Sequence, residues 1–146
     1  MGTFHCEPTK IAEWRTLVLQ AQEKAGLQLS EPIENYVVIT LDAYTQFTTL
    51  SATAIAIDYL EQLQNLSRHN MHVLRGIGDQ CLILSGLFPD RAKRKNVSKH
   101  YFMRLGKSAY YILSSVDIAW KLDNTLFYQL FESFSDLTSV LRSMRA

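Results

Sequence analysis

Residues 74–111 read LRGIGDQCLILSGLFPDRAKRKNVSKHYFMRLGKSAYY and decide the fold. Both ends of this stretch carry apolar residues at the spacing of amphipathic helices, and a basic segment that begins at Pro89 separates them. Gly76, Gly78 and Gly106 interrupt the two helices, although a glycine costs a helix interior about 1 kcal/mol relative to alanine. Since small residues allow helix axes to come close, we expect these two helices to pack tightly together.

The rest of the chain also carries its apolar residues at helical spacing. Local signals mark the helix ends: Pro8 suits a first turn, Gly26 suits a C-terminal stop, and Ser30 suits an N-cap. Ser67, Ser98 and Asp123 can likewise cap later helices. The helices expected from these signals cover about residues 8–25, 31–47, 51–66, 68–85, 99–121 and 124–141.

We therefore predict an all-α, single-domain bundle of about six helices over residues 1–146, with residues 1–7 frayed. A length of 146 residues suits one domain with its own core, and 47% hydrophobic content is ordinary for a globular protein. Residues 36–41 and 50–57 are rich in β-branched side chains and would also suit strands. No Asn-Gly or Asp-Gly turn separates two alternating runs, so helices are favoured there too.

Several protein classes do not fit the composition. No apolar run approaches the roughly 18 residues of a membrane span, and the N-terminus lacks the pattern of a signal peptide. Cys6 and Cys81 lie in unlike surroundings, which favours free thiols and a cytoplasmic location. His69 and His72 lack a third ligand at a suitable spacing, so we read them as surface residues and expect neither a metal site nor a cofactor.

Asp79 is the most distinctive polar residue of the central stretch. It can form an ion pair with Arg75 one turn earlier or, if buried, it needs hydrogen-bond donors. Donors are available on the helix predicted over 99–121. The resulting candidate polar pocket comprises Arg75, Asp79, Tyr101, Arg104, Ser108 and Tyr110, with Tyr111 as a further donor. No nucleophile–base pair or second carboxylate completes a catalytic site.

Charge is unevenly distributed along the chain. Residues 67–107 hold nine of the fifteen Lys and Arg residues but only two of the fourteen acids. A cluster of this kind can bind phosphate groups or other anions. No helix-turn-helix or RNA-binding motif accompanies it, and the net charge is only +1, so we do not expect nucleic-acid binding. The basic loop consists of Arg91, Lys93, Arg94, Lys95 and Lys99.

The order of short motifs in residues 78–110 resembles a family of small, uncharacterised bacterial helical proteins. The family pattern is Gly-Asp, an apolar run, Ser-Gly-x-Phe-Pro, an aromatic pair and Gly-x-x-Ala-Tyr. Phe102 departs from it, because the family has a second tyrosine there. The resemblance implies a helical bacterial protein and brings no activity, ligand or partner. The matching residues are Gly78, Asp79, Ser85, Gly86, Phe88, Pro89, Tyr101, Phe102, Gly106, Ala109 and Tyr110.

Taken together, these features predict a non-enzymatic helical protein that acts through protein–protein contacts and self-associates as a homodimer. The prediction rests on the many apolar helix faces, on seven tyrosines and on acidic and basic regions that could complement each other. One alternative is a small-molecule binder or an unrecognised enzyme that uses the polar pocket at Asp79. A second is anion or nucleic-acid binding through the basic loop 91–99.

Overall fold

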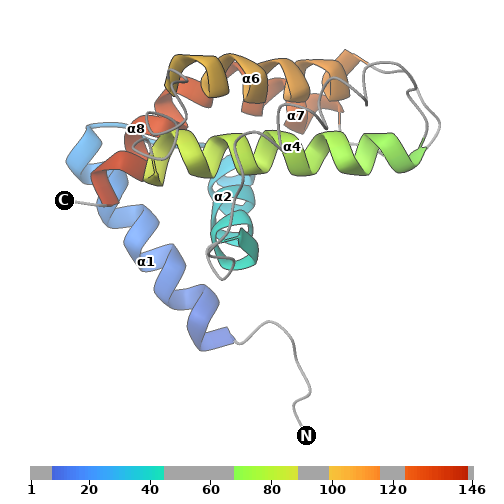
Figure 1. The fold of residues 1–146 in the computed structure, drawn as a ribbon. Helices are drawn as coiled ribbons and strands as arrows, with labels where there is room; N and C mark the ends of the chain where they lie inside the picture. Colours follow the sequence, from blue (N-terminus) through green and yellow to red (C-terminus); the bar gives the residue numbers. More distant parts are fainter. Residues whose placement is uncertain (1–7, 45–67, 89–98, 116–123, 145–146) are drawn as a thin grey trace, which may run out of the picture.

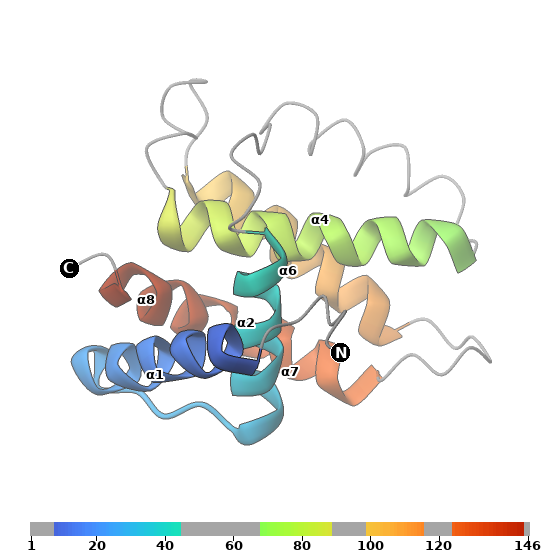
Figure 2. The ribbon, with the colours of Figure 1, turned by 90° about the horizontal axis from the view of Figure 1, so that it is seen from below.

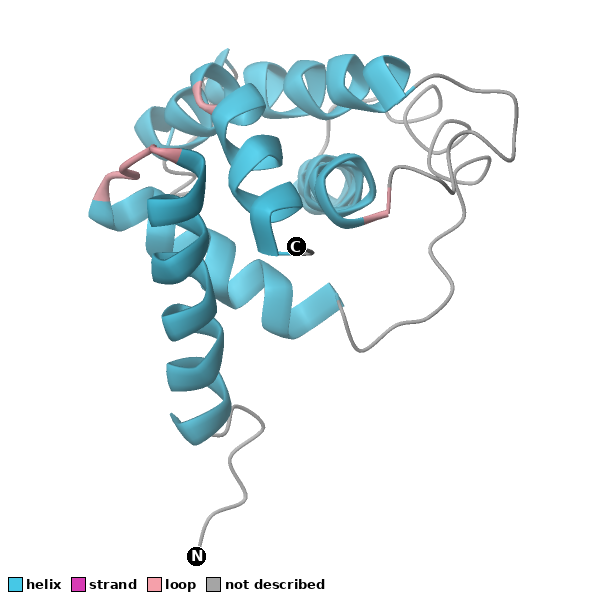
Figure 3. Cartoon of the chain, turned by 90° about the vertical axis from the view of Figure 1, so that its left-hand side faces the viewer, coloured by secondary structure: helices cyan, strands magenta, loops and turns pink. Residues whose placement is uncertain are grey.

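The computed structural model describes residues 8–44, 68–88, 99–115 and 124–144. Within these ranges the chain forms helices and no strand, which confirms the predicted all-α bundle (Figure 3). None of the described helices is long and apolar enough to cross a membrane. The helices are α1 (Pro8–Ala25), α2 (Glu31–Tyr44), α4 (Arg68–Leu87), α6 (Lys99–Ser115), α7 (Asn124–Glu132) and α8 (Phe134–Met144).

Where the described residues test them, most predicted helix boundaries agree, with one exception; the predicted ends near 47 and 121 and the predicted frayed segment 1–7 lie outside the described residues. Residues 36–41 lie inside α2, so their strand alternative is excluded, whereas residues 50–57 and the predicted helix 51–66 lie outside the described residues. The single helix predicted over 124–141 is instead two helices, α7 and α8, which part at Ser133. The physical reason lies in packing, because α7 contacts mainly α6 while α8 contacts mainly α1 and α4.

Gly26 ends α1 in the way its sequence position predicts. Its φ angle is 69°, in the left-handed region that favours glycine. The N–H groups of Gly26 and Leu27 donate to the carbonyls of Glu23 (3.2 Å) and Gln22 (3.0 Å). This is the Schellman pattern, which satisfies carbonyls at the end of the helix and turns the chain toward α2.

A polar cluster then holds α2 against α1. Glu34 of α2 accepts hydrogen bonds from Arg15 (3.0 Å) and from the side-chain amide of Gln22 (3.1 Å), both on α1. The carbonyl oxygen of the same Gln22 amide accepts from the N–H of Leu29 in the connection at 2.8 Å. The position of α2 relative to α1 is therefore set by polar side chains as well as by the apolar core.

The centre of the molecule is an antiparallel pair formed by α4 and α6, which share the most extensive helix contact (Figure 1). Seen from below, α1 and α8 lie side by side and α2 crosses near the middle of the molecule (Figure 2). One apolar core fills the space between these helices. Its largest fully buried side chains are Tyr110, Phe102, Phe134, Ile33, Leu41, Met71, Leu74, Ile77, Leu82, Ile83, Leu84 and Leu113.

Candidate functional site

Asp79 of α4 lies inside this core, with only 6% of its surface exposed. One of its carboxylate oxygens, Oδ1, accepts two hydrogen bonds of 2.6 Å, from the hydroxyls of Tyr36 and Tyr110. Tyr36 comes from α2 and Tyr110 from α6. Through these two short hydrogen bonds Asp79 joins three helices at one buried point.

Arg75 acts on this carboxylate through Tyr36. Its Nε atom donates to the Tyr36 hydroxyl at 3.0 Å, and its guanidinium lies over the rings of Tyr36 (5.1 Å) and Phe127 (5.9 Å). Arg75 and Asp79 do not form a direct ion pair, unlike Lys10–Asp42 and Arg15–Glu34 among the described side chains, so Tyr36 takes the place of a bridge between them. The network thus runs from Arg75 through Tyr36 to Asp79.

Burial and charge shift the pKa values of these groups. Burial raises the pKa of Asp79, while the hydrogen bonds from Tyr110 and Tyr36 and the charge of Arg75 partly oppose that rise. Burial, reinforced by the adjacent Asp79, raises the pKa of Tyr36 and of Tyr110 far above the usual range of a phenol. Both tyrosines therefore stay protonated and donate to Asp79, and the Tyr36 hydroxyl also accepts from Arg75.

The three glycines singled out in the sequence have different surroundings. A Cβ atom at Gly78 would stand 2.7 Å from the Tyr110 ring, and one at Gly106 would stand 2.6 Å from the ring of Phe134 and 2.9 Å from Cβ of Cys81. At Gly76 the nearest atom would be the Tyr44 hydroxyl, at 3.4 Å. Gly78 and Gly106 therefore lie at close contacts between elements, whereas Gly76 has room around it.

Of the donors predicted on α6, the structure brings only Tyr110 to Asp79. Tyr101 packs edge-on against Phe102, with ring centroids 5.2 Å apart, and Arg104 and Ser108 are exposed. Successive residues of a helix point about 100° apart, so neighbours in sequence reach different surroundings. Tyr111, beside Tyr110 in the sequence, is 49% exposed and lies outside the network.

Sequence reasoning missed Tyr36, the second donor to Asp79. One signal was present, because Tyr36 lies between Ile33 and Thr40 on the face of α2 that is buried. A tyrosine on a buried face needs a partner for its hydroxyl, which marks it as a candidate for any buried acceptor. Nothing local to α2, however, points to Asp79, which is 43 residues away in the sequence.

A small pocket of about 220 Å³ opens beside this network, between α2 and α4. We refer to it as the α2–α4 pocket. Asp79 is one of the residues that line it. Ile39, Ala43 and Tyr44 line the pocket on α2, and His72, Arg75 and Asp79 line it on α4.

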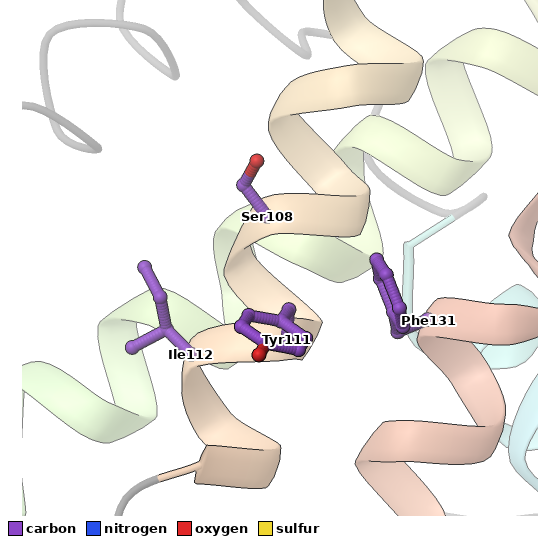
Figure 4. A pocket seen from close by; sticks show the side chains of 4 residues that line it. All are labelled: Ser108, Tyr111, Ile112 and Phe131. Carbon is purple, nitrogen blue, oxygen red and sulfur yellow. The ribbon is translucent and has the colours of Figure 1, made fainter.

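A second hollow, of about 360 Å³, lies between α6 and α7 and is largely apolar. Figure 4 shows Tyr111 of α6 beside Phe131 of α7, and their ring centroids are 5.0 Å apart. Tyr128 also packs against Phe131, with ring centroids 5.8 Å apart, and the Lys107 ammonium lies 5.6 Å from the centre of the Phe131 ring. The hollow is lined by Ser108, Tyr111, Ile112 and Phe131. We call it, together with the neighbouring side chains of Lys107 and Tyr128, the aromatic groove.

Two further kinds of site considered from the sequence are an anion site at the basic loop and a metal site. Residues 91–98 of the basic loop lie outside the described residues, and Lys99 begins α6, so anion binding there stays a prediction. In the part of the chain that the structure describes, no three His, Cys, Asp or Glu side chains gather to form a metal site. No family model, curated protein or solved structure matches the chain.

Proposed function

We propose that this protein is a non-enzymatic helical protein that acts through protein–protein contacts and forms a homodimer through the aromatic groove. The observation that carries the proposal is the exposure of two tyrosines at this groove. Tyr111 is 49% exposed and Tyr128 is 44% exposed, although both pack against Phe131. Tyrosine is enriched at protein interfaces, because its ring can be buried while its hydroxyl finds a partner.

The charges around the groove favour a second copy of the chain as the partner. Arg104 and Lys107 lie on α6, and the exposed Glu132 lies one helical turn after Tyr128, on the same side of α7. In a two-fold symmetric contact, the same patch meets itself in the opposite orientation. The basic edge of each copy can then face the acidic edge of the other, with the aromatic rings between them.

Two further observations support a non-enzymatic protein in a reducing compartment, which we propose is the bacterial cytoplasm. Cys81 is a free, buried cysteine, and burial raises the pKa of its thiol, so it does not serve as a reactive thiolate. The Oδ1 atom of Asp79 accepts hydrogen bonds from two tyrosines on neighbouring helices. A buried thiol and a carboxylate that joins helices both serve to stabilise the fold.

Light scattering across a concentration series tests the dimer. We expect a mass of twice the 16.7 kDa chain at tens of micromolar, and the dimer should dissociate on dilution with a single Kd. A mass of one chain at all concentrations up to about 100 µM would contradict the proposal, since a weaker Kd is of little use for a stable homodimer.

A charge exchange tests which surface forms the dimer. Glu132→Lys should weaken association by placing bases on both edges of the groove, and adding Lys107→Glu in the same chain should restore it. Glu13→Lys, on the exposed side of α1, is the matched control and should leave the Kd unchanged. If the control weakens the dimer as much as Glu132→Lys, another surface carries the contact.

A further inference from the structure

The α2–α4 pocket has the features of a small ligand site that is separate from the aromatic groove. Its volume is about 220 Å³, and small residues keep it open. Gly76 has no side chain to fill it, and Ala43 on the opposite wall adds only a methyl group. Drug-sized ligands usually occupy about 300–1,000 Å³, so this space limits a ligand to a much smaller molecule.

Asp79 offers an acceptor on the pocket wall. Both tyrosine hydroxyls donate to Oδ1, and no described residue donates to Oδ2. A carboxylate has about four acceptor sites on its two oxygens, and the described residues use only those of Oδ1, so Oδ2 is the acceptor that a ligand in the pocket would use. The tyrosines also hold the carboxylate in position, so a ligand would not have to order it on binding.

Arg75 offers donors on the same wall. Only its Nε is engaged by a described residue, the Tyr36 hydroxyl, and its guanidinium is held in place over two aromatic rings. A guanidinium has five N–H donors in a planar fork that matches a carboxylate. The remaining donors, on the two terminal nitrogens, are therefore suited to an anionic group.

Once Asp79 has lost its proton, the charges of the wall balance, which restricts the ligand further. A simple cation would be attracted by Asp79 and repelled by Arg75, and a simple anion would meet the reverse. A molecule that carries both charges a few ångströms apart satisfies both residues. Ile39, which is 60% exposed, and Ala43 supply apolar surface on the opposite wall, which suits a short hydrocarbon group.

We propose that the α2–α4 pocket binds a small apolar α-amino acid, with its ammonium group at Asp79 and its carboxylate at Arg75. His72, an exposed residue of the same wall, lies near enough to the pocket to contact the ligand as well. This inference is independent of the proposed homodimer, because the two sites share no residue.

Isothermal titration calorimetry with L-valine and its two matched analogues tests the charge requirement. Isobutylamine is valine without the carboxylate, and isovalerate is valine without the amine. We expect L-valine to bind at least about tenfold more tightly than either analogue, which is a difference of about 1.4 kcal/mol. The proposal is wrong if isobutylamine or isovalerate binds as tightly as L-valine. It is also wrong if L-valine gives no detectable heat of binding at ligand concentrations up to about 10 mM.

Variants of the wild-type chain locate the binding. Ala43→Phe fills the pocket from its exposed rim without touching the buried hydrogen bonds, and it should abolish L-valine binding while circular dichroism and the melting temperature stay unchanged. Ala12→Phe, at an exposed alanine of α1, is the matched control and should bind normally. Arg75→Gln should weaken L-valine at least about tenfold and leave isobutylamine unaffected or improved. L-valine binding that survives Ala43→Phe would place the ligand elsewhere and overturn the assignment.

Discussion

The ring of Tyr110 lies directly against the backbone of Gly78, where an added Cβ atom would stand 2.7 Å from its Cε1 atom. The hydroxyl of the same ring donates to Asp79, the next residue in the chain, at 2.6 Å. Gly78 thus makes room for the ring and Asp79 receives its hydroxyl. Gly78 and Asp79 of α4 together accommodate one tyrosine of α6. This contact explains why a glycine is tolerated inside the helix.

Gly78→Ala should therefore lower the free energy of unfolding by about 1–3 kcal/mol, the usual cost of overpacking a filled core. Gly76→Ala is the matched control two residues earlier, where the new methyl group would meet the Tyr44 hydroxyl at 3.4 Å and the Gln80 side-chain nitrogen at 3.8 Å. It should be neutral or stabilise the protein by up to about 1 kcal/mol, because alanine favours the helix. Urea denaturation of both variants measures the difference, and equal effects would show that the Tyr110 contact is not limiting.

The local signals of the sequence were sufficient for much of the fold. Gly26 ends α1 through its own backbone conformation, and Ser30 precedes α2, whose first helical hydrogen bond runs from Glu34 N–H to the Ser30 carbonyl. The break at Ser133 could not be predicted in this way. Backbone hydrogen bonds continue on both sides of it, to Gln129 and from Leu137, so only the different packing partners of α7 and α8 separate them.

The candidate site was predictable only in part, for a related reason. Asp79 stood out because it follows two glycines in an apolar helix, and Arg75 and Tyr110 were among its proposed neighbours. Which of several donors reaches a buried carboxylate depends on the rotation of each helix about its axis. The sequence does not determine that rotation, so Tyr101 and Ser108 were as plausible as Tyr110 as donors to Asp79 before the structure showed their positions.

Gly106 should be as intolerant of a side chain as Gly78, because Cys81 of α4 and Phe134 of α8 both approach it. We expect Gly106→Ala to lower the free energy of unfolding by about 1–3 kcal/mol. Phe134→Leu removes the closest ring atoms, so the double variant should lose less stability than the two single changes added together. A double-mutant cycle measures this coupling, and strict additivity would mean that the Phe134 ring does not set the cost.

Asp79→Asn and Asp79→Ala should have very different effects on stability. The asparagine carbonyl can still accept from Tyr36 and Tyr110, whereas alanine leaves two buried hydroxyls without their acceptor. Each hydroxyl without a partner costs roughly 1–3 kcal/mol, so we expect Asp79→Ala to lose on the order of 2–6 kcal/mol and Asp79→Asn clearly less. Thermal and urea unfolding compare them, and equal losses would show that the charge of Asp79, rather than its accepting role, supports the fold.

The same carboxyl group should also make stability depend on pH. Its folded-state pKa is raised above the ordinary value of 3.8, with burial as the largest cause, so the folded protein holds the proton to a higher pH than the unfolded chain does. The stabilising contribution of this group is therefore complete below a pH of about 4 and is lost as the pH rises through the folded-state pKa.

Asp79→Asn is the reference variant for this pH dependence, because the side-chain amide of asparagine does not ionise between acidic and neutral pH. We expect the free energy of unfolding of the wild-type protein, minus that of Asp79→Asn, to fall as the pH increases from about 4 toward neutrality. Urea denaturation of both proteins at matched pH values measures the difference, and the subtraction removes contributions from groups that both share. A difference that rises with pH would show instead that Tyr36, Tyr110 and Arg75 together outweigh burial and hold the carboxylate charged.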